Sequence, residues 1–96
     1  MLYYSLGIHF EWDSDKEKKN IRKHGIAFKT ASKVFWDADR LEFYDSVHSN
    51  AQEERYITIG IVQDILVVVY TERGNAIRLI SARRANSKER ELYYGD

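Results

Sequence analysis

The stretch from Ile65 to Ala85 constrains the fold more than any other part of the chain. It begins with an unbroken apolar run, Ile65–Tyr70, which is typical of a strand that is covered on both faces. A Gly-Asn pair then marks a turn, and Ile77 and Leu79 alternate with Arg78 along the next strand. Two adjacent arginines follow near the end of the segment. The sequence therefore predicts a β-hairpin inside a sheet, with arginines carried to one end of it.

The length and composition indicate one small domain. A chain of 96 residues is the size of a single folding unit, so we expect residues 1–96 to form one domain. No apolar run approaches the roughly 18–20 residues that span a bilayer, and the first residues lack the basic and apolar regions of a secretory signal. The lack of cysteine suits a reducing compartment. We therefore predict a cytoplasmic protein without a membrane segment.

The charges are segregated along the chain although they sum to zero. Residues 16–33 carry seven cations against one acid, and residues 37–54 carry six acids against one cation. Residues 73–90 are basic again. Two interpretations stay open at this point. The segments form solvated faces that balance each other, or they form a basic groove for one partner and an acidic edge for another.

Local signals predict the element order β-α-α-β-β-β-β-α. A capping box at Ser14–Glu17 starts the first helix, and Gly25 ends it where a left-handed residue is favoured. Phe28–Trp36 has helical spacing, and the short connections after it predict an antiparallel meander. The fold class is therefore α+β, with two early helices on one sheet face and a final helix over residues 88–94. The expected strands cover residues 8–12, 41–45, 55–62, 65–70 and 77–82.

Alternation assigns the strand residues to two faces of the sheet. The residues expected to face the helices are Leu41, Phe43, Ile57, Ile59, Ile77 and Leu79. The residues expected on the opposite face are Glu42, Tyr44, Tyr56, Thr58 and Arg78, with Arg84 sharing the parity of Arg78. Such a face suits nucleic acid, because arginine pairs with phosphate and tyrosine stacks on bases. Ordinary cross-strand tyrosine pairs are the alternative.

The reactive side chains favour metal-free chemistry on an anion. The three histidines lack the spacing of a zinc site, and there is no glycine-rich phosphate loop. We therefore expect no metal and no cofactor. Arginines can stabilise negative charge, and a histidine, tyrosine, lysine or glutamate can move a proton. Attack of an RNA 2′-hydroxyl on its own phosphodiester is a reaction that needs these groups.

Five blocks of the sequence, taken in order, resemble the BrnT family of type II toxin–antitoxin toxins. The blocks are residues 10–13 (FEWD), Asn20 with residues 22–28 (RKHGIAF), residues 54–60 (ERYITIG), residues 68–71 (VVYT) and residues 77–85 (IRLISARRA). The resemblance implies a RelE-like fold with two N-terminal helices on a mainly antiparallel sheet of four to five strands, followed by a short C-terminal helix. Residues 1–8 are then expected to be an N-terminal extension.

The same resemblance implies a function and its partners. We expect a metal-independent endoribonuclease that cleaves RNA, inhibits translation and is neutralised by a BrnA-like antitoxin protein. Operator DNA would be bound only by the toxin–antitoxin complex. The alternative is a catalytically inactive RelE-like module that binds protein or nucleic acid.

Matching the blocks residue by residue assigns phosphate handling to three arginines and proton transfer to one histidine: Arg55, Arg83, Arg84 and His24. His24 has a structural alternative, because a histidine before a C-terminal glycine often caps the last helix carbonyls. Arg55 has one too, in an ion pair at the sheet end. Arg83 and Arg84 point to opposite sides of a regular strand, so both join Arg55 only if the strand breaks near Ala82. Weaker candidates for RNA contact are Lys19, Lys23, Tyr70 and Arg78.

Overall fold

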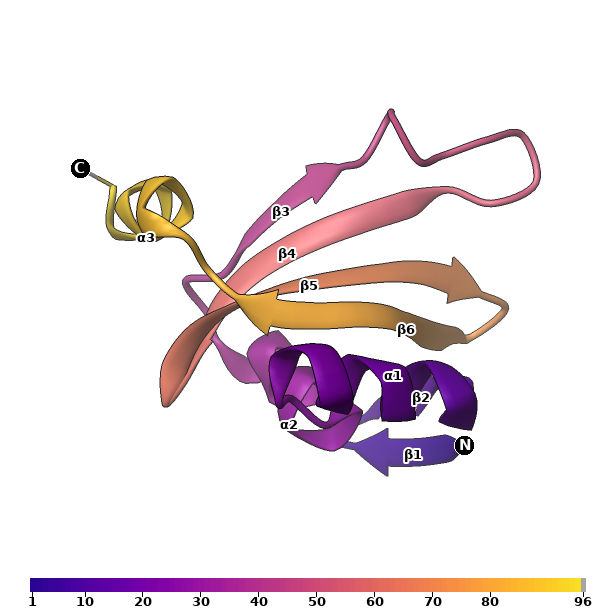
Figure 1. Ribbon diagram of the computed structural model, residues 1–96. Coiled ribbons are helices and arrows are strands. Elements are labelled where there is room, and N and C mark those ends of the chain that lie inside the picture. The colour runs from indigo at the N-terminus through magenta and orange to yellow at the C-terminus, as the bar shows by residue number, and fades with distance from the viewer. Residues whose placement is uncertain (96) are drawn as a thin grey trace.

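The computed structural model, which describes residues 1–95, is built on one mixed sheet of six strands (Figure 1). Its strands are β1 (Leu2–Ser5), β2 (Ile8–Glu11), β3 (Leu41–Tyr44), β4 (Arg55–Val62), β5 (Asp64–Arg73) and β6 (Ala76–Arg84). They lie in the order β1-β2-β6-β5-β4-β3. The β2–β6 pair is parallel and every other neighbouring pair is antiparallel. The α+β prediction is confirmed, but the expected four to five strands are six, because β1 was not predicted.

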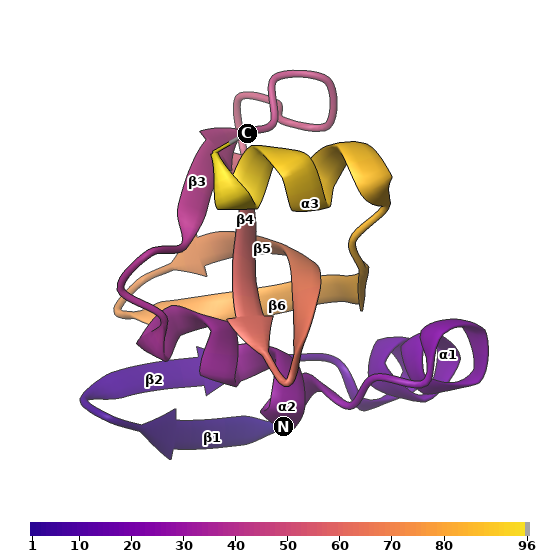
Figure 2. The same ribbon diagram turned by 90° about the vertical axis from the view of Figure 1, so that its left-hand side faces the viewer.

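The helices lie on both faces of this sheet. They are α1 (Ser14–His24), α2 (Phe28–Ser32), the 3₁₀ helix η1 (Lys33–Trp36) and α3 (Ser87–Tyr94). Figure 2 shows α3 on one side of the β5–β6 ribbon, whereas α1 and α2 lie on the other side. The single helix expected over Phe28–Trp36 is thus an α-helix followed by a 3₁₀ turn. Its first residue is preceded by Ala27, which offers no side-chain cap.

The start of α1 differs from the predicted capping box. Asp13, not Ser14, is the N-cap, and its Oδ1 accepts the backbone N–H of Asp15 at 2.8 Å. Glu17 therefore does not form the predicted capping box and accepts other hydrogen bonds instead. Its carboxylate accepts the indole N–H of Trp12 at 3.1 Å and the backbone N–H of Phe28 at 2.8 Å. Glu17 therefore ties α1 to the start of α2.

Two apolar clusters fill the two faces of the sheet. The larger cluster joins the sheet to α1, α2 and η1, and its buried residues include Phe10, Trp12, Phe28, Val34, Leu66, Val68, Tyr70, Leu79 and Ala82. The smaller cluster is formed by Ile59, Ile65 and Val67, with Leu41, Ile57 and Tyr93 packed against it. Tyr93 belongs to α3. The strand β5 is thus covered on both faces, as its apolar run predicts.

The predicted division of faces is wrong for β3 and β4. Ile57 and Ile59 face α3, whereas Ile77 and Leu79 face α1 and α2. Within β3 and β4, the prediction correctly put Glu42 and Thr58 on the same face, since these residues pair. That face is the one covered by α1 and α2. The error lies in the relative parity of β4 and β6, which follows from strand register and not from local pattern.

A β-bulge in β6 decides where the arginines point. Val69 pairs with Ser81 but Tyr70 pairs with Leu79, so Ile80 has no partner in the β5–β6 ladder. After this extra residue, the side chains of odd-numbered and even-numbered positions of β6 change faces. Leu79 and Ala82 therefore both enter the larger cluster, although they are three residues apart. Arg83 therefore shares a face with Arg78. The predicted shared parity of Arg84 and Arg78 is wrong for this reason.

The buried amide of Asn20 connects α1 to the edge of this bulged strand. Its Nδ2 donates to the carbonyl groups of Ile26 and Ala82, each at 2.9 Å, and its Oδ1 accepts the N–H of Ala82 at 3.0 Å. Asn20→Ala would leave these buried backbone groups unpaired, so we expect the free energy of unfolding to fall by about 3 kcal/mol. Urea denaturation measures this change. Lys18→Ala, an exposed position on the same helix, is the control, and an equal effect of both variants would contradict the role of Asn20.

Candidate active site

A groove of about 310 Å³ lies on the face of the sheet that is turned away from α1 and α2. We call this face the open face. The apolar floor of the groove consists of Ile57, Val67, Val69 and Ile80. Its polar lining consists of Asp45, His48, Arg55, Ser81, Arg83 and Glu89. These side chains come from β4, β5, β6, α3 and the loop after β3, so the groove exists only in the folded sheet.

Arg83 enters the groove from the end of β6. It forms a bidentate ion pair with Glu89 in the first turn of α3, with Nη1–Oε1 and Nη2–Oε2 distances of 2.7 and 2.8 Å. The hydrogen bonds from Arg83 lower the pKa of Glu89, although partial burial of the carboxylate opposes the shift. The same pair raises the pKa of Arg83. A paired guanidinium fork of this kind matches a phosphate group equally well.

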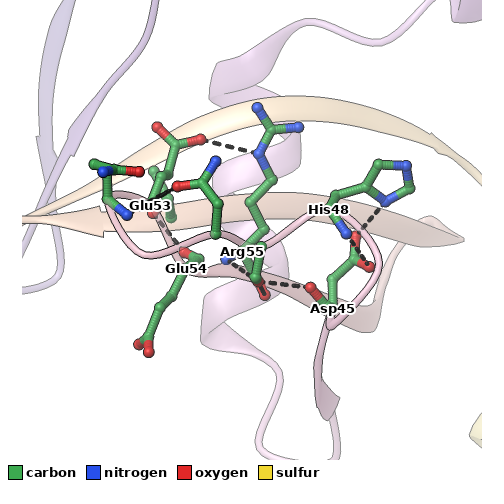
Figure 3. A network of polar contacts seen from close by, with 9 residues as sticks. Asp45, His48, Glu53, Glu54 and Arg55 are labelled. Atoms are coloured by element: carbon green, nitrogen blue, oxygen red, sulfur yellow. Dashed lines mark hydrogen bonds and ion pairs between the residues drawn. The ribbon is translucent and has the colours of Figure 1, made fainter.

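Arg55 reaches the same groove from the start of β4. Its Nε donates to Oε1 of Glu53 at 2.9 Å, which Figure 3 shows. The expected alternative, an ion pair at the sheet end, is therefore present, and the residue nevertheless lines the groove. Arg55 on β4 and Arg83 on β6 lie on opposite sides of β5, so their two cations flank one apolar floor. Because each arginine is paired with a glutamate, an anion can bind between them only by displacing these carboxylates.

An aspartate and a histidine that were not predicted complete the lining. His48 donates from Nδ1 to Oδ2 of Asp45 at 2.8 Å, and its backbone N–H donates to Oδ1 of the same carboxylate at 3.3 Å (Figure 3). Partial burial would raise the pKa of Asp45, but the hydrogen bonds from His48 together lower it. The carboxylate is therefore ionised near neutral pH and holds the imidazole with Nε2 free. Such a pair can take up or release a proton.

The sequence contains one local signal for this pair. Asp45 and His48 are three residues apart directly after a strand, and the Asp45 N–H donates to the carbonyl of Arg55 at 2.8 Å. An Asp-x-x-His spacing at that place is typical of a side-chain-capped turn. Its meeting with Arg55 depends on the β3–β4 register, which the spacing alone does not reveal.

Arg84 and His24 lie on the other side of β6. Arg84 donates from Nη1 to the carbonyl of His24 at 3.1 Å and pairs through Nε with Asp64 at 3.3 Å. It is thus the arginine, and not the histidine ring, that caps the last turn of α1. The strand continues through Arg84 without a break at Ala82, so the expected convergence of three arginines does not occur. The structure brings together only Arg55 and Arg83.

The weaker candidates for RNA contact are divided between both faces. Lys19 and Lys23 are exposed on α1, far from the groove. Tyr70 is 3% exposed and its hydroxyl donates to Glu42 on the helix side of the sheet. Burial raises the pKa of Tyr70. Arg78 lies on the open face and pairs with Glu11 of β2 at 2.7 Å.

Two features are absent from residues 1–95, the part of the chain that the structure describes. In this range no three His, Cys, Asp or Glu side chains gather closely enough to hold a metal ion. No helix in the same range is long and apolar enough to cross a membrane.

Comparison with known proteins places the chain in a family. The model of the ribonuclease toxin BrnT of type II toxin–antitoxin systems matches residues 12–89. The chain therefore belongs to the BrnT family of ribonuclease toxins. A search of curated proteins found no match. Among solved structures, the ribonuclease toxin BrnT of Brucella abortus is similar, with 28% sequence identity and a TM-score of 0.63 over 81% of this chain and 96% of that one.

Proposed function

We propose that this member of the BrnT family is a RelE-like, metal-independent endoribonuclease whose active site is the groove on the open face. The observation that carries the proposal is the meeting of Arg55, Arg83 and the Asp45–His48 pair in one groove. Two cations there can surround a phosphodiester, and an oriented imidazole can move a proton beside it. We propose that the protein acts in the cytoplasm and inhibits translation by cleaving RNA.

The proposed reaction is transfer of a phosphodiester to its own 2′-hydroxyl. The bond from the 2′-oxygen to phosphorus forms while the bond from phosphorus to the 5′-oxygen breaks. Nε2 of His48 takes the proton of the attacking 2′-hydroxyl, and Asp45 stabilises the imidazolium that arises. The leaving 5′-oxygen receives its proton from water. Negative charge grows on the phosphoryl oxygens in the transition state, and the two guanidinium groups of Arg55 and Arg83 offset it. Glu89 must release Arg83, wholly or in part, for this contact to form.

We further propose a protein partner that controls this activity. A BrnA-like antitoxin would neutralise the toxin by covering the groove, and a stable complex should bury at least roughly 1,000 Å². Its contact residues should be acidic and apolar, matching the arginines and the floor of the groove. Operator DNA would be bound only by the complex of toxin and antitoxin.

An RNA cleavage assay with the purified protein tests the enzymatic proposal. We expect cleavage of single-stranded RNA in the presence of EDTA and arrest of growth when the chain is expressed without an antitoxin. Absence of cleavage would refute the enzymatic proposal. Growth arrest without cleavage would instead favour the alternative, a catalytically inactive module that acts by binding.

A further inference from the structure

The open face does not end at the groove. Arg55, Thr71 and Arg78 are in register across β4, β5 and β6. Two strand spacings therefore separate the backbones of Arg55 and Arg78, which is about 10 Å. Beyond Arg78 the row continues to Glu11 on β2, which accepts the hydrogen bond from Arg78. An anionic chain that lies in the groove thus meets a further cation on the same face.

The hairpin β1–β2 extends this face beyond the residues matched by the family model, which begin at residue 12. Tyr4 and His9 form a cross-strand pair with ring centroids 4.5 Å apart. Phe10 points into the core and is 1% exposed, so its neighbour His9 points to the open face, and Tyr4 with it. Tyr4 is 62% exposed. Two aromatic rings therefore stand in solvent on the face that carries the arginines.

These rings border a second hollow, with a volume of about 470 Å³. Leu2, Tyr4, His9, Asn75 and Ala76 are among its lining residues. Ala76 precedes Arg78 by two positions on β6, which is about 7 Å along the strand. Exposed aromatic rings, a side-chain amide and a nearby guanidinium are the groups that bind an unpaired nucleotide, by stacking, base-edge hydrogen bonds and phosphate contact.

We infer that the β1–β2 hairpin and Arg78 form a nucleotide-binding subsite for single-stranded RNA, outside the groove where cleavage occurs. This inference rests on the proposed ribonuclease function. A nucleobase stacks on the exposed ring of Tyr4, which His9 contacts from the neighbouring strand, with Asn75 at the edge of the base. Arg78 exchanges Glu11 for a phosphate of the same strand. The subsite contributes binding energy but no reacting group. It therefore acts on the affinity for RNA and on KM, and it acts only on substrates long enough to reach it.

The subsite predicts a length-dependent loss of affinity. In a background silenced by His48→Ala, fluorescence anisotropy would measure the binding of labelled RNA oligonucleotides of two and of eight nucleotides. We expect Tyr4→Ala with His9→Ala to weaken binding of the longer RNA about tenfold or more, and to leave the dinucleotide unchanged. Tyr4→Phe keeps the ring and should keep the affinity. Arg78→Ala should weaken binding of the longer RNA and leave binding of the dinucleotide unchanged.

Tyr44→Ala is the matched control, because Tyr44 is a similarly exposed tyrosine on the opposite face of the sheet. Thermal melting of each variant confirms that it is folded. If the hairpin variant binds the longer RNA as tightly as the Tyr44→Ala variant does, the subsite is refuted. The ribonuclease proposal would survive that result, because cleavage by the protein with an intact His48 is measured separately.

Discussion

Replacement of both groove arginines, Arg55→Ala with Arg83→Ala, is expected to lower kcat for RNA cleavage at least a hundredfold. The two guanidinium groups are the cations that line the groove, and donors aimed at developing charge typically contribute about that factor each. Part of the effect falls on kcat and not on KM, because the charge on the phosphoryl oxygens grows only in the transition state. Single-turnover cleavage of a fluorescent RNA measures this loss.

Two single variants sharpen the result. Arg22→Ala removes an exposed cation from α1, on the other side of the sheet, and should leave cleavage unchanged. Arg84→Ala distinguishes an active site that contains only Arg55 and Arg83 from the site of three arginines that the sequence suggested. Cleavage should be unchanged in this variant if the groove is the active site. A hundredfold loss in Arg84→Ala at unchanged stability, with full activity in the Arg55→Ala, Arg83→Ala protein, would contradict the assignment of the groove.

His48→Ala is the second variant for which we expect a large effect, a loss of cleavage of about 10²–10⁴-fold. The ring Nδ1 is held by Asp45 at 2.8 Å, so Nε2 is the atom available to substrate. Asp45→Asn should lower the rate as well, because it removes the charge that stabilises the imidazolium. The pH–rate profile of His48→Ala should lack one limb that the unaltered protein shows.

The sign of the pH effect follows from Asp45. Its pKa is lowered in the folded protein, so the His48–Asp45 contact is fully present above the ordinary aspartate pKa and is lost as the pH falls through the lowered value. The charge of the Asp45 carboxylate is therefore constant across neutral pH. His24→Ala is the matched control, because His24 lies on the other side of β6. Loss of cleavage in His24→Ala but not in His48→Ala would overturn the proton-transfer role of His48.

Local patterns in the sequence were sufficient for most of the fold. Gly25 ends α1 in the left-handed conformation, with φ of +72°, and Asn86 starts α3 in a capping box with Glu89. Both features depend on neighbours within a few residues. The strand β1 was missed because a short edge strand of mixed polarity has no distinct period. It is specified by its pairing with β2.

The site was predictable only in part, for a related reason. Arg55 and Arg83 could be named from the resemblance, but their common face depends on the bulge at Ile80. One unpaired residue reverses the direction of every side chain after it, and no local pattern marks it here. The meeting of Asp45 and His48 with Arg55 likewise depends on the pairing of β3 with β4, which brings the ends of two separate segments together.

The open face carries its own counterions. Three of its arginines are each paired with a glutamate, in the pairs Arg83–Glu89, Arg55–Glu53 and Arg78–Glu11. A polyanion that binds there displaces internal carboxylates, and fewer dissolved ions are exchanged than three free arginines would require. RNA binding should then depend less steeply on salt than the number of arginines suggests. A single small anion gains little from displacing one glutamate, whereas a chain of phosphates can displace several at once. We therefore expect the proposed RNA-binding face to bind a chain of several phosphates in preference to a single phosphate.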